Sequence, residues 1–125
     1  MILLWIGCGG FLGSVLRYVA GVGLMRWLAP STYPWGTFAV NIVGCFLIGI
    51  MAALSDLNRL QDERLRLFFM VGLLGGFTTF SAFGLETFRL LRDGHNLLAL
   101  WNVAAQIGLG LAGVWLRFTL TRAWS

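Results

Sequence analysis

Four long runs of apolar residues occupy most of the chain, and short polar stretches separate them. The runs predict helices over about residues 2–28, 35–54, 65–92 and 97–122. A helix rises about 1.5 Å per residue, so each run is long enough to cross a hydrocarbon layer about 30 Å thick. The pattern predicts an all-α membrane protein with four transmembrane helices, in which residues 1–125 form a single transmembrane domain.

The polar stretches between the runs are too short to form a second domain. Pro30 and Pro34 mark the turn after the first predicted helix, and residues 93–96 form the turn before the fourth. Only residues 55–64 make an aqueous loop of any length, and this loop is charged. The N-terminus lacks the cationic start of a secretory signal, so we expect the first apolar run to be retained.

Composition agrees with a membrane location. Hydrophobic residues make up 58% of the chain and charged residues 11%, against about 25% charged residues in a typical soluble domain. Every cationic side chain is an arginine, and the arginines are scattered near the predicted helix ends. They indicate anchors at the membrane interface or attractors for anions, not a nucleic-acid surface. Cys8 and Cys45 lie inside predicted helices, where we expect small buried side chains rather than a disulfide or a metal pair.

The arginines are divided almost evenly between the two sides of the predicted bundle. With four spans, both termini share one side with the charged loop, and this side holds Arg59, Arg64, Arg66, Arg117 and Arg122. The other side holds Arg26, Arg89 and Arg92, with Arg17 as a fourth if it is assigned there. Because an excess of arginine on one side sets the orientation of a membrane protein, so small a bias would allow both orientations and an antiparallel homodimer.

Small and polar residues form a stripe on the first and on the fourth predicted helix. On the first helix the stripe consists of Gly7, Gly10, Ser14, Arg17 and Gly21, at spacings of three and four. On the fourth helix it consists of Asn102, Gln106, Gly110, Gly113 and Arg117. Small residues let helices approach closely in lipid, so these stripes indicate a compact bundle and no particular function.

The centre of the third predicted helix is a poor helix by propensity. A glycine pair, Gly75 and Gly76, is followed closely by the β-branched pair Thr78 and Thr79, which predicts a break. Unwound backbone at this depth is tolerated only where it is buried in protein or lines a cavity. Its carbonyl groups need a donor or a cation. If the break lies on a dimer axis, carbonyls from both subunits would surround one small cation, and sodium suits such a cage.

Two aromatic and several polar residues surround the predicted break. Phe80 and Phe83 share a helix face and either fill space or direct their electropositive ring edges into a pathway. Ser81 adds a hydroxyl donor. Thr37 and Asn41 share a face of the second helix. An unpaired carboxamide within a span is costly, so Asn41 needs a partner, which is either another helix or a species passing through.

Arg17 and Glu86 are ionisable residues inside predicted helices. Arg17 either extends toward an interface or sets a positive potential at a pore mouth, since a charge inside a span is costly unless it is functional or paired. Glu86 lies near the end of the third helix. There we expect it to extend toward water or to pair with Arg89 or Arg92.

Three motifs, together with the four-span layout, resemble those of a known family. They read Gly9-Gly10-x-x-Gly13-x-x-x-Arg17-Tyr18, Trp35-Gly36-Thr37-Phe38-x-Val40-Asn41-x-x-Gly44, and Gly72-x-x-Gly75-Gly76-Phe77-Thr78-Thr79-Phe80-Ser81-x-Phe83. On these residues the chain resembles the Fluc family of fluoride channels, also called CrcB, most strongly over about residues 7–90. The fourth helix departs from the family, because Asn102 and Gln106 stand where hydroxyl side chains usually face the pore.

The resemblance implies an antiparallel, dual-topology homodimer in the bacterial inner membrane, with two pores that are each lined by both subunits. It implies passive, selective export of fluoride from the cytoplasm, which lowers fluoride toxicity, and no enzymatic activity. Fluoride, membrane lipid and a second copy of the chain are the expected partners. Nucleic acid is not expected to bind.

The resemblance also implies site residues. The expected pore and fluoride-binding residues are Asn41, Phe80, Phe83, Thr37 and Ser81. The backbone carbonyl groups of Gly75 and Thr78 are expected to bind a structural sodium ion at the dimer interface. This ion would be a cofactor that is not transported.

Two other classes of membrane protein compete with this interpretation. A proton-coupled exporter of the small multidrug resistance type needs a membrane-embedded carboxylate, typically in its first helix, and the first helix here has none. A non-transporting assembly subunit would account for the small-residue stripes but not for an interrupted third helix. An enzyme is not indicated, because the chain contains neither a nucleophile–base set nor a cluster of metal ligands.

Overall fold

The computed structural model describes all 125 residues, and every regular element is a helix. The elements are α1 (Ile2–Trp27), α2 (Trp35–Asp56), α3 (Glu63–Arg66), the π-helix η1 (Leu67–Leu74), α4 (Gly75–Phe77), α5 (Phe80–Arg92) and α6 (Asn96–Ala123). The four segments Ile2–Trp27, Trp35–Asp56, Glu63–Arg92 and Asn96–Ala123 are each long and apolar enough to cross a membrane. The prediction of an all-helical, four-span membrane protein is therefore confirmed.

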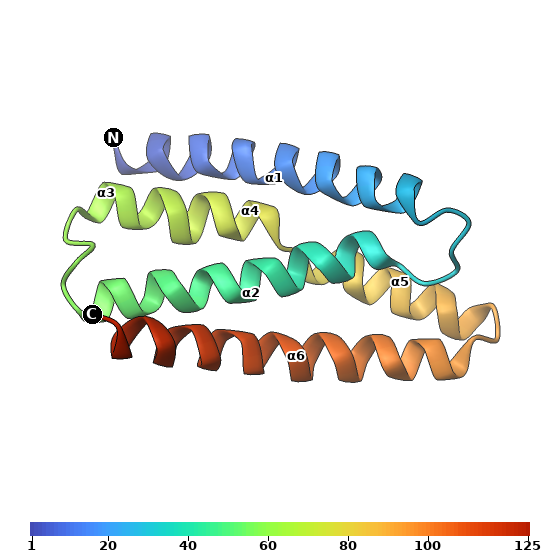
Figure 1. Cartoon of the computed structure of the whole chain (residues 1–125). Coiled ribbons are helices and arrows are strands. Elements are labelled where there is room, and N and C mark those ends of the chain that lie inside the picture. Colours follow the sequence, from blue (N-terminus) through green and yellow to red (C-terminus); the bar gives the residue numbers. More distant parts are fainter.

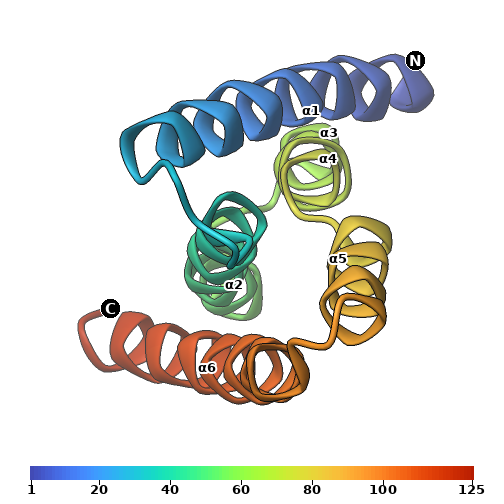
Figure 2. The same ribbon diagram turned by 90° about the vertical axis from the view of Figure 1, so that its right-hand side faces the viewer.

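The four spans lie side by side, with the chain reversing direction at each turn (Figure 1). Both termini and the loop between α2 and α3 lie at one end, and the other two connections lie at the opposite end (Figure 1). Viewed end-on, α1 and α6 lie on opposite sides of the bundle and α2 lies between them (Figure 2). Helix α2 contacts both, while α1 also packs along η1 and α4. The centre of the bundle is therefore formed by α2 and the third span.

Glycines allow α1 to contact the third span through backbone atoms. A methyl group at Gly9 would collide with the carbonyl oxygen of Phe68, and one at Gly13 with that of Leu73. A methyl group at Gly76 would lie 2.6 Å from the Gly10 carbonyl oxygen. Such close approach maximises dispersion contacts where lipid offers no hydrophobic drive for association. The tightest packing of the first helix therefore runs through Gly9 and Gly13, whereas a methyl group at Gly7 or Gly21 of the predicted stripe would have no atom within 4 Å.

We expect Gly9→Ala to destabilise the protein by about 1–3 kcal/mol, the usual cost of overpacking. The new methyl group would lie 2.9 Å from the Leu73 nitrogen, so α1 would have to move away from η1. Gly7→Ala is the matched control, because a methyl group at Gly7 has no atom within 4 Å in the chain. Thermal unfolding in detergent would measure both variants. Equal melting temperatures would contradict this packing.

The first half of the third span departs from α-helical winding. Leu67–Leu74 forms a π-helix, a rare winding that occurs often near functional sites. The sequence predicted ordinary helix from about residue 65, because the apolar run of η1 carries no signal that separates one winding from the other. Gly72 lies inside this element and is buried against the backbone of α1.

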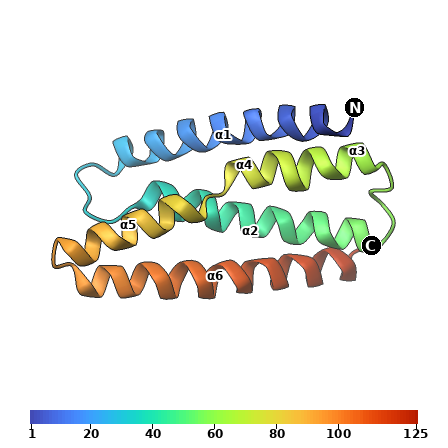
Figure 3. The same ribbon diagram turned by 180° about the vertical axis from the view of Figure 1, so that it is seen from behind.

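Between α4 and α5 the backbone is extended for two residues. Thr78 has φ −87° and ψ 159°, and Thr79 has φ −151° and ψ 118°. The side-chain oxygen of Thr79 caps α5 by accepting from the Ala82 N–H at 3.2 Å. Gly75 and Gly76 stay helical. Seen from behind, α4 and α5 are joined by this short strand-like link and do not share one continuous ribbon (Figure 3).

The connections are compact. In the first, Tyr33 is 5% exposed and packs edge-on against Trp35 and Phe38, with ring centroids 4.7 Å and 5.8 Å away. In the turn after α5, Arg92 pairs with Asp93 at 2.9 Å and holds the pKa of that carboxyl group below its ordinary value. The first turn is therefore held by packed aromatic rings, whereas the ion pair of the turn after α5 is exposed.

Candidate functional site: an uncharged cavity beside the extended segment

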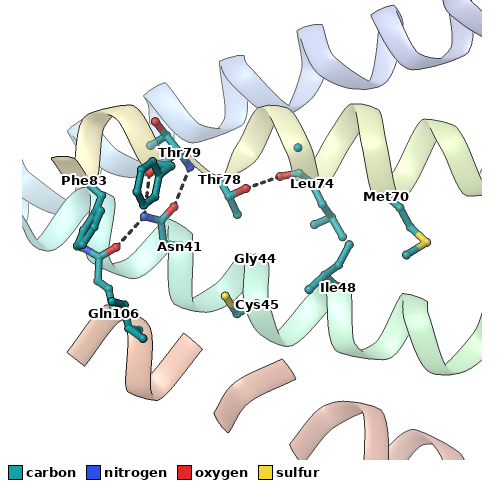
Figure 4. Close-up of a pocket in the computed structure, with 13 residues that line it drawn as sticks. Asn41, Gly44, Cys45, Ile48, Met70, Leu74, Thr78, Thr79, Phe83 and Gln106 are labelled. Atoms are coloured by element: carbon teal, nitrogen blue, oxygen red, sulfur yellow. Dashed lines mark hydrogen bonds between the residues drawn. The ribbon is translucent and has the colours of Figure 1, made fainter. Parts of the chain in front are cut away.

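A cavity of about 360 Å³ lies between α2, the third span and α6, beside the extended segment (Figure 4). It is lined by Asn41, Gly44, Cys45, Ile48, Met70, Leu74, Gly75, Thr78, Thr79, Phe80, Phe83, Gln106 and Ile107. None of these side chains is charged. The cavity thus combines apolar walls with a few hydroxyl and carboxamide groups.

Asn41 binds the backbone of the extended segment, which consists of Thr78 and Thr79. It bonds to both the N–H group and the carbonyl group of Thr79. Its Oδ1 accepts from the Thr79 N–H at 2.8 Å, and its Nδ2 donates to the Thr79 carbonyl at 3.1 Å. Nδ2 also donates to Gln106 Oε1 at 2.7 Å. Figure 4 shows Asn41 between the segment and Gln106. The carboxamide therefore replaces the helical hydrogen bonds that Thr79 lacks, and the partner required for Asn41 is another part of the chain.

Further polar groups extend from Gln106 into the bundle. Gln106 donates through Nε2 to Asn102 Oδ1 at 2.9 Å, and the Tyr33 hydroxyl donates to the same oxygen at 2.9 Å. Asn102 is 0% exposed, so its carboxamide depends entirely on these partners. From the sequence, Asn102 and Gln106 of α6 were noted without an assigned role, and Tyr33 was not identified. A lone tyrosine between two prolines carried no signal of a buried partner.

The two phenylalanines line the same cavity from the start of α5. Their ring centroids are 5.6 Å apart, and the ring planes are tilted by 43°. Phe80 is 83% exposed in the single chain, while Phe83 is half-buried. Phe80 has little intrachain packing that would explain an aromatic side chain at this position.

The backbone around Gly75 and Thr78 presents free carbonyl groups. The Thr79 N–H, which would bond to Gly75 if the helix continued, is taken by Asn41. The Thr78 carbonyl accepts no backbone N–H group, while the Thr78 hydroxyl donates to the Leu74 carbonyl at 2.9 Å. Both residues line the cavity.

The remaining predicted residues lie elsewhere. Thr37 borders a second cavity of about 540 Å³ together with Arg17 and Glu86. The Thr37 hydroxyl donates to Glu86 Oε1 at 2.8 Å, whereas Glu86 Oε2 is buried without a partner. The expected pairing of Glu86 with an arginine of its own helix is wrong, because its carboxylate faces α2. Ser81 is exposed, with its hydroxyl 3.3 Å from that of Thr79.

Comparison with known proteins identifies the family. The model of the family described as CrcB-like protein, Camphor Resistance (CrcB), matches residues 4–118. The chain belongs to the CrcB family. The match covers all three motifs of the sequence and every residue that lines the cavity.

Curated relatives of this CrcB-family chain align with most of its length. A Rhizobium etli protein named fluoride-specific ion channel FluC is 43% identical over 120 residues, which cover 96% of this chain and 95% of the relative. Proteins of the same name from Geobacter sulfurreducens and Rhizobium meliloti are 45% identical over 113 residues and 40% identical over 121 residues. These alignments cover 90% of both chains in the first case, and 97% of this chain and 96% of the relative in the second. All three are named as ion channels and not as enzymes, as the sequence predicted for this chain.

Proposed function

We propose that this chain forms a passive ion channel selective for fluoride. The observation that carries the proposal is that Asn41, Phe80 and Phe83, three residues from two motifs far apart in sequence, line one uncharged cavity beside the extended segment. Membership of a family whose curated relatives are named fluoride-specific ion channels supports the same function. Ser81 would serve as a further hydroxyl donor near Phe80. Thr37 would do so only after its hydroxyl leaves Glu86 Oε1, to which it donates at 2.8 Å.

The chemistry of the cavity suits a small, strongly hydrated anion. A dehydrated fluoride ion needs close hydrogen-bond donors, and hydroxyl and carboxamide groups supply them without a fixed positive charge. The electropositive edges of Phe80 and Phe83 add weak attraction. A channel must bind its ion firmly enough for entry and weakly enough for release, and an uncharged lining meets both conditions.

We further propose that two copies assemble antiparallel and form two pores. A single chain leaves Phe80 83% exposed and the cavity open on one side, so a second copy would complete the wall. The nearly even distribution of arginines between the two sides favours insertion in both orientations. A bacterial inner membrane is the proposed location.

Passive export of fluoride follows from acid–base chemistry. Hydrogen fluoride is neutral and crosses lipid from an acidic medium, then dissociates in the less acidic cytoplasm. A channel releases the trapped anion down its electrochemical gradient and so lowers its toxicity. No coupled ion and no chemical step are needed.

The backbone at Gly75 and Thr78 fits a structural sodium ion. The Thr78 carbonyl receives no backbone donor, and the Gly75 carbonyl loses its helical donor to Asn41. One chain offers too few oxygens for a cation that prefers several oxygen ligands, but a two-fold axis would double the number. The ion would stabilise the pair of chains and would not itself be transported.

Replacing Gly75 with alanine should raise the dimer dissociation constant at least about tenfold, or about 1.4 kcal/mol. Within one chain the new methyl group would meet only the Met70 carbonyl oxygen, at 3.9 Å, so the chain itself should fold normally. At the interface the methyl group would separate the backbones that share the ion. Single-molecule subunit-capture measurements in bilayers, with and without sodium, would give the dissociation constants.

Gly23→Ala is the control for Gly75→Ala, because a methyl group at Gly23 has no atom within 4 Å in the chain and Gly23 lies on α1, away from the extended segment. It should leave association unchanged. If association of the unmodified protein proves indifferent to sodium, the sodium site has to be abandoned.

Fluoride release from liposomes tests the proposed function. Purified protein in fluoride-loaded vesicles should release the ion, recorded with a fluoride electrode, while an ionophore balances the charge. Chloride release should be at least about a hundredfold slower, which corresponds to about 2.7 kcal/mol. Chloride release at a comparable rate would refute selectivity. Release that requires a proton gradient would indicate a coupled exporter.

A further inference from the structure

Four side chains form a hydrogen-bonded series from the cavity into the bundle, which we call the amide relay (Asn41, Gln106, Asn102 and Thr87). Asn41 donates to Gln106 at 2.7 Å, Gln106 to Asn102 at 2.9 Å, and Asn102 to Thr87 at 2.9 Å. Thr87 donates to the Phe83 carbonyl at 2.8 Å. The relay joins α2, α6 and α5, and it connects the cavity to a hydroxyl group that does not line it.

The direction of the relay is fixed at its Thr87 end. A carbonyl oxygen only accepts, so the single hydroxyl hydrogen of Thr87 goes to Phe83. Toward Asn102 the hydroxyl can only accept, and it therefore faces Nδ2. Asn102 Oδ1 is left for Gln106 and for the Tyr33 hydroxyl. Gln106 must then present Nε2 to Asn102.

The other end of the relay imposes the same direction. The Thr79 N–H only donates, so it faces Asn41 Oδ1. Asn41 Nδ2 then gives its two hydrogens to the Thr79 carbonyl and to Gln106 Oε1. Two independent constraints thus select one orientation for Gln106, and Asn41 keeps no free hydrogen.

Counting hydrogens shows which carboxamide of the relay can still donate into the cavity. Gln106 Nε2 carries two hydrogens, and only one of them is used, in the bond to Asn102. Gln106 lines the cavity, whereas Asn102 is 0% exposed and does not. In this chain the free amide hydrogen beside Phe83 therefore belongs to Gln106.

We infer that Thr87 is a positioning residue for ion conduction. Its hydroxyl, acting through Asn102, holds Gln106 so that Nε2 and its free hydrogen face the cavity. The reversed carboxamide would present an oxygen there and would repel an anion. Removal of the hydroxyl leaves Asn41 as the only group that selects this orientation, so the free-energy difference between the two orientations becomes smaller. The inference rests on the proposed function, because it concerns how the cavity treats a permeating anion.

The test compares Thr87→Val, which keeps the shape of the side chain and removes the hydroxyl, with Thr87→Ser, which keeps the hydroxyl. Thr119→Val is the matched control, because the Thr119 hydroxyl makes the same bond to the carbonyl four residues earlier, at 2.8 Å, on an exposed face outside the relay. Fluoride flux should fall at least about fivefold in Thr87→Val, since conduction depends on well-placed donors, and should stay near the original rate in the other two. Thr87→Ala repeats the test if Thr87→Val does not fold.

A second measurement does not depend on transport. The chain has only two glutamines, the exposed Gln61 and the buried Gln106. Nitrogen-15 labelling of glutamine side chains therefore gives one internal reference and one reporter in a nuclear magnetic resonance spectrum. Thr87→Val should shift the Gln106 side-chain amide signals and leave those of Gln61 in place. Thr87→Ser and Thr119→Val should shift neither.

The outcomes separate the inference from the proposed function. Unchanged Gln106 signals in Thr87→Val, or shifted signals with unchanged flux, would overturn the positioning role. Equal loss of flux in Thr87→Ser and Thr87→Val would overturn it as well, since the first retains the hydroxyl. If the unmodified protein releases no fluoride, the proposed function fails, and the Gln106 signals still decide whether Thr87 sets the orientation of that carboxamide.

Discussion

Replacing Phe80 or Phe83 with isoleucine should lower fluoride flux at least about tenfold, a barrier increase of about 1.4 kcal/mol. Both rings line the cavity, with centroids 5.6 Å apart. Isoleucine retains bulk but has no electropositive ring edge, so the ion would lose the weak attraction of the rings in the cavity. Flux from liposomes, normalised to the fraction of active vesicles, provides the measurement.

Phe88→Ile is the control for the ring substitutions. Phe88 lies on the same helix, is 58% exposed and does not line the cavity. Its replacement should leave flux unchanged. Should Phe80→Ile and Phe83→Ile also conduct at the original rate, the rings would have no part in the pathway.

Asn41→Leu should destabilise the protein by about 2–4 kcal/mol, because each unsatisfied buried polar group costs about 1–3 kcal/mol. The substitution removes both bonds to the Thr79 backbone and the bond to Gln106 Oε1. It should also abolish fluoride flux, since the extended segment and the Gln106 carboxamide lose their common partner. Unfolding in mixed micelles, followed by circular dichroism, would give the change in stability.

Asn96→Leu is the matched control, since Asn96 is exposed at the start of α6. Its unfolding free energy should stay within the range of ordinary surface substitutions, about 0.5 kcal/mol. An Asn41→Leu protein as stable as this control would mean that the extended segment does not depend on Asn41.

The spans could be predicted from hydropathy because lipid imposes one strong condition on sequence. A spanning segment must be apolar, and it must satisfy its backbone internally, so length and composition nearly determine a helix. The four segments Ile2–Trp27, Trp35–Asp56, Glu63–Arg92 and Asn96–Ala123 are all long and apolar enough to span. The third segment departs from the backbone condition at Thr78 and Thr79, which are extended. The first turn could be predicted for a similar reason. Pro30 and Pro34 restrict the backbone locally and lack an N–H donor, so they mark the end of a helix in the sequence itself.

Pairings between distant polar residues could not be predicted in the same way. Asn41 was expected to have a partner, but nothing in the sequence pointed to the Thr79 backbone, because backbone groups carry no residue identity. Glu86 was expected to extend toward water or to pair with an arginine near it in sequence, whereas its partner Thr37 lies 49 residues away. The position of the extended residues depends on such a contact: Thr78 and Thr79 leave the helix where Asn41 binds, while the glycine pair before them stays helical.

Both ends of the polypeptide emerge on one face of the bundle (Figure 1). A concatemer made by joining two copies head to tail with a short flexible linker would therefore force them to insert in the same direction. An inverted tandem requires one extra hydrophobic helix between the copies, which carries the linker across the bilayer. Comparing the two fusions would show which relative orientation the chains need, without any label or cross-linker.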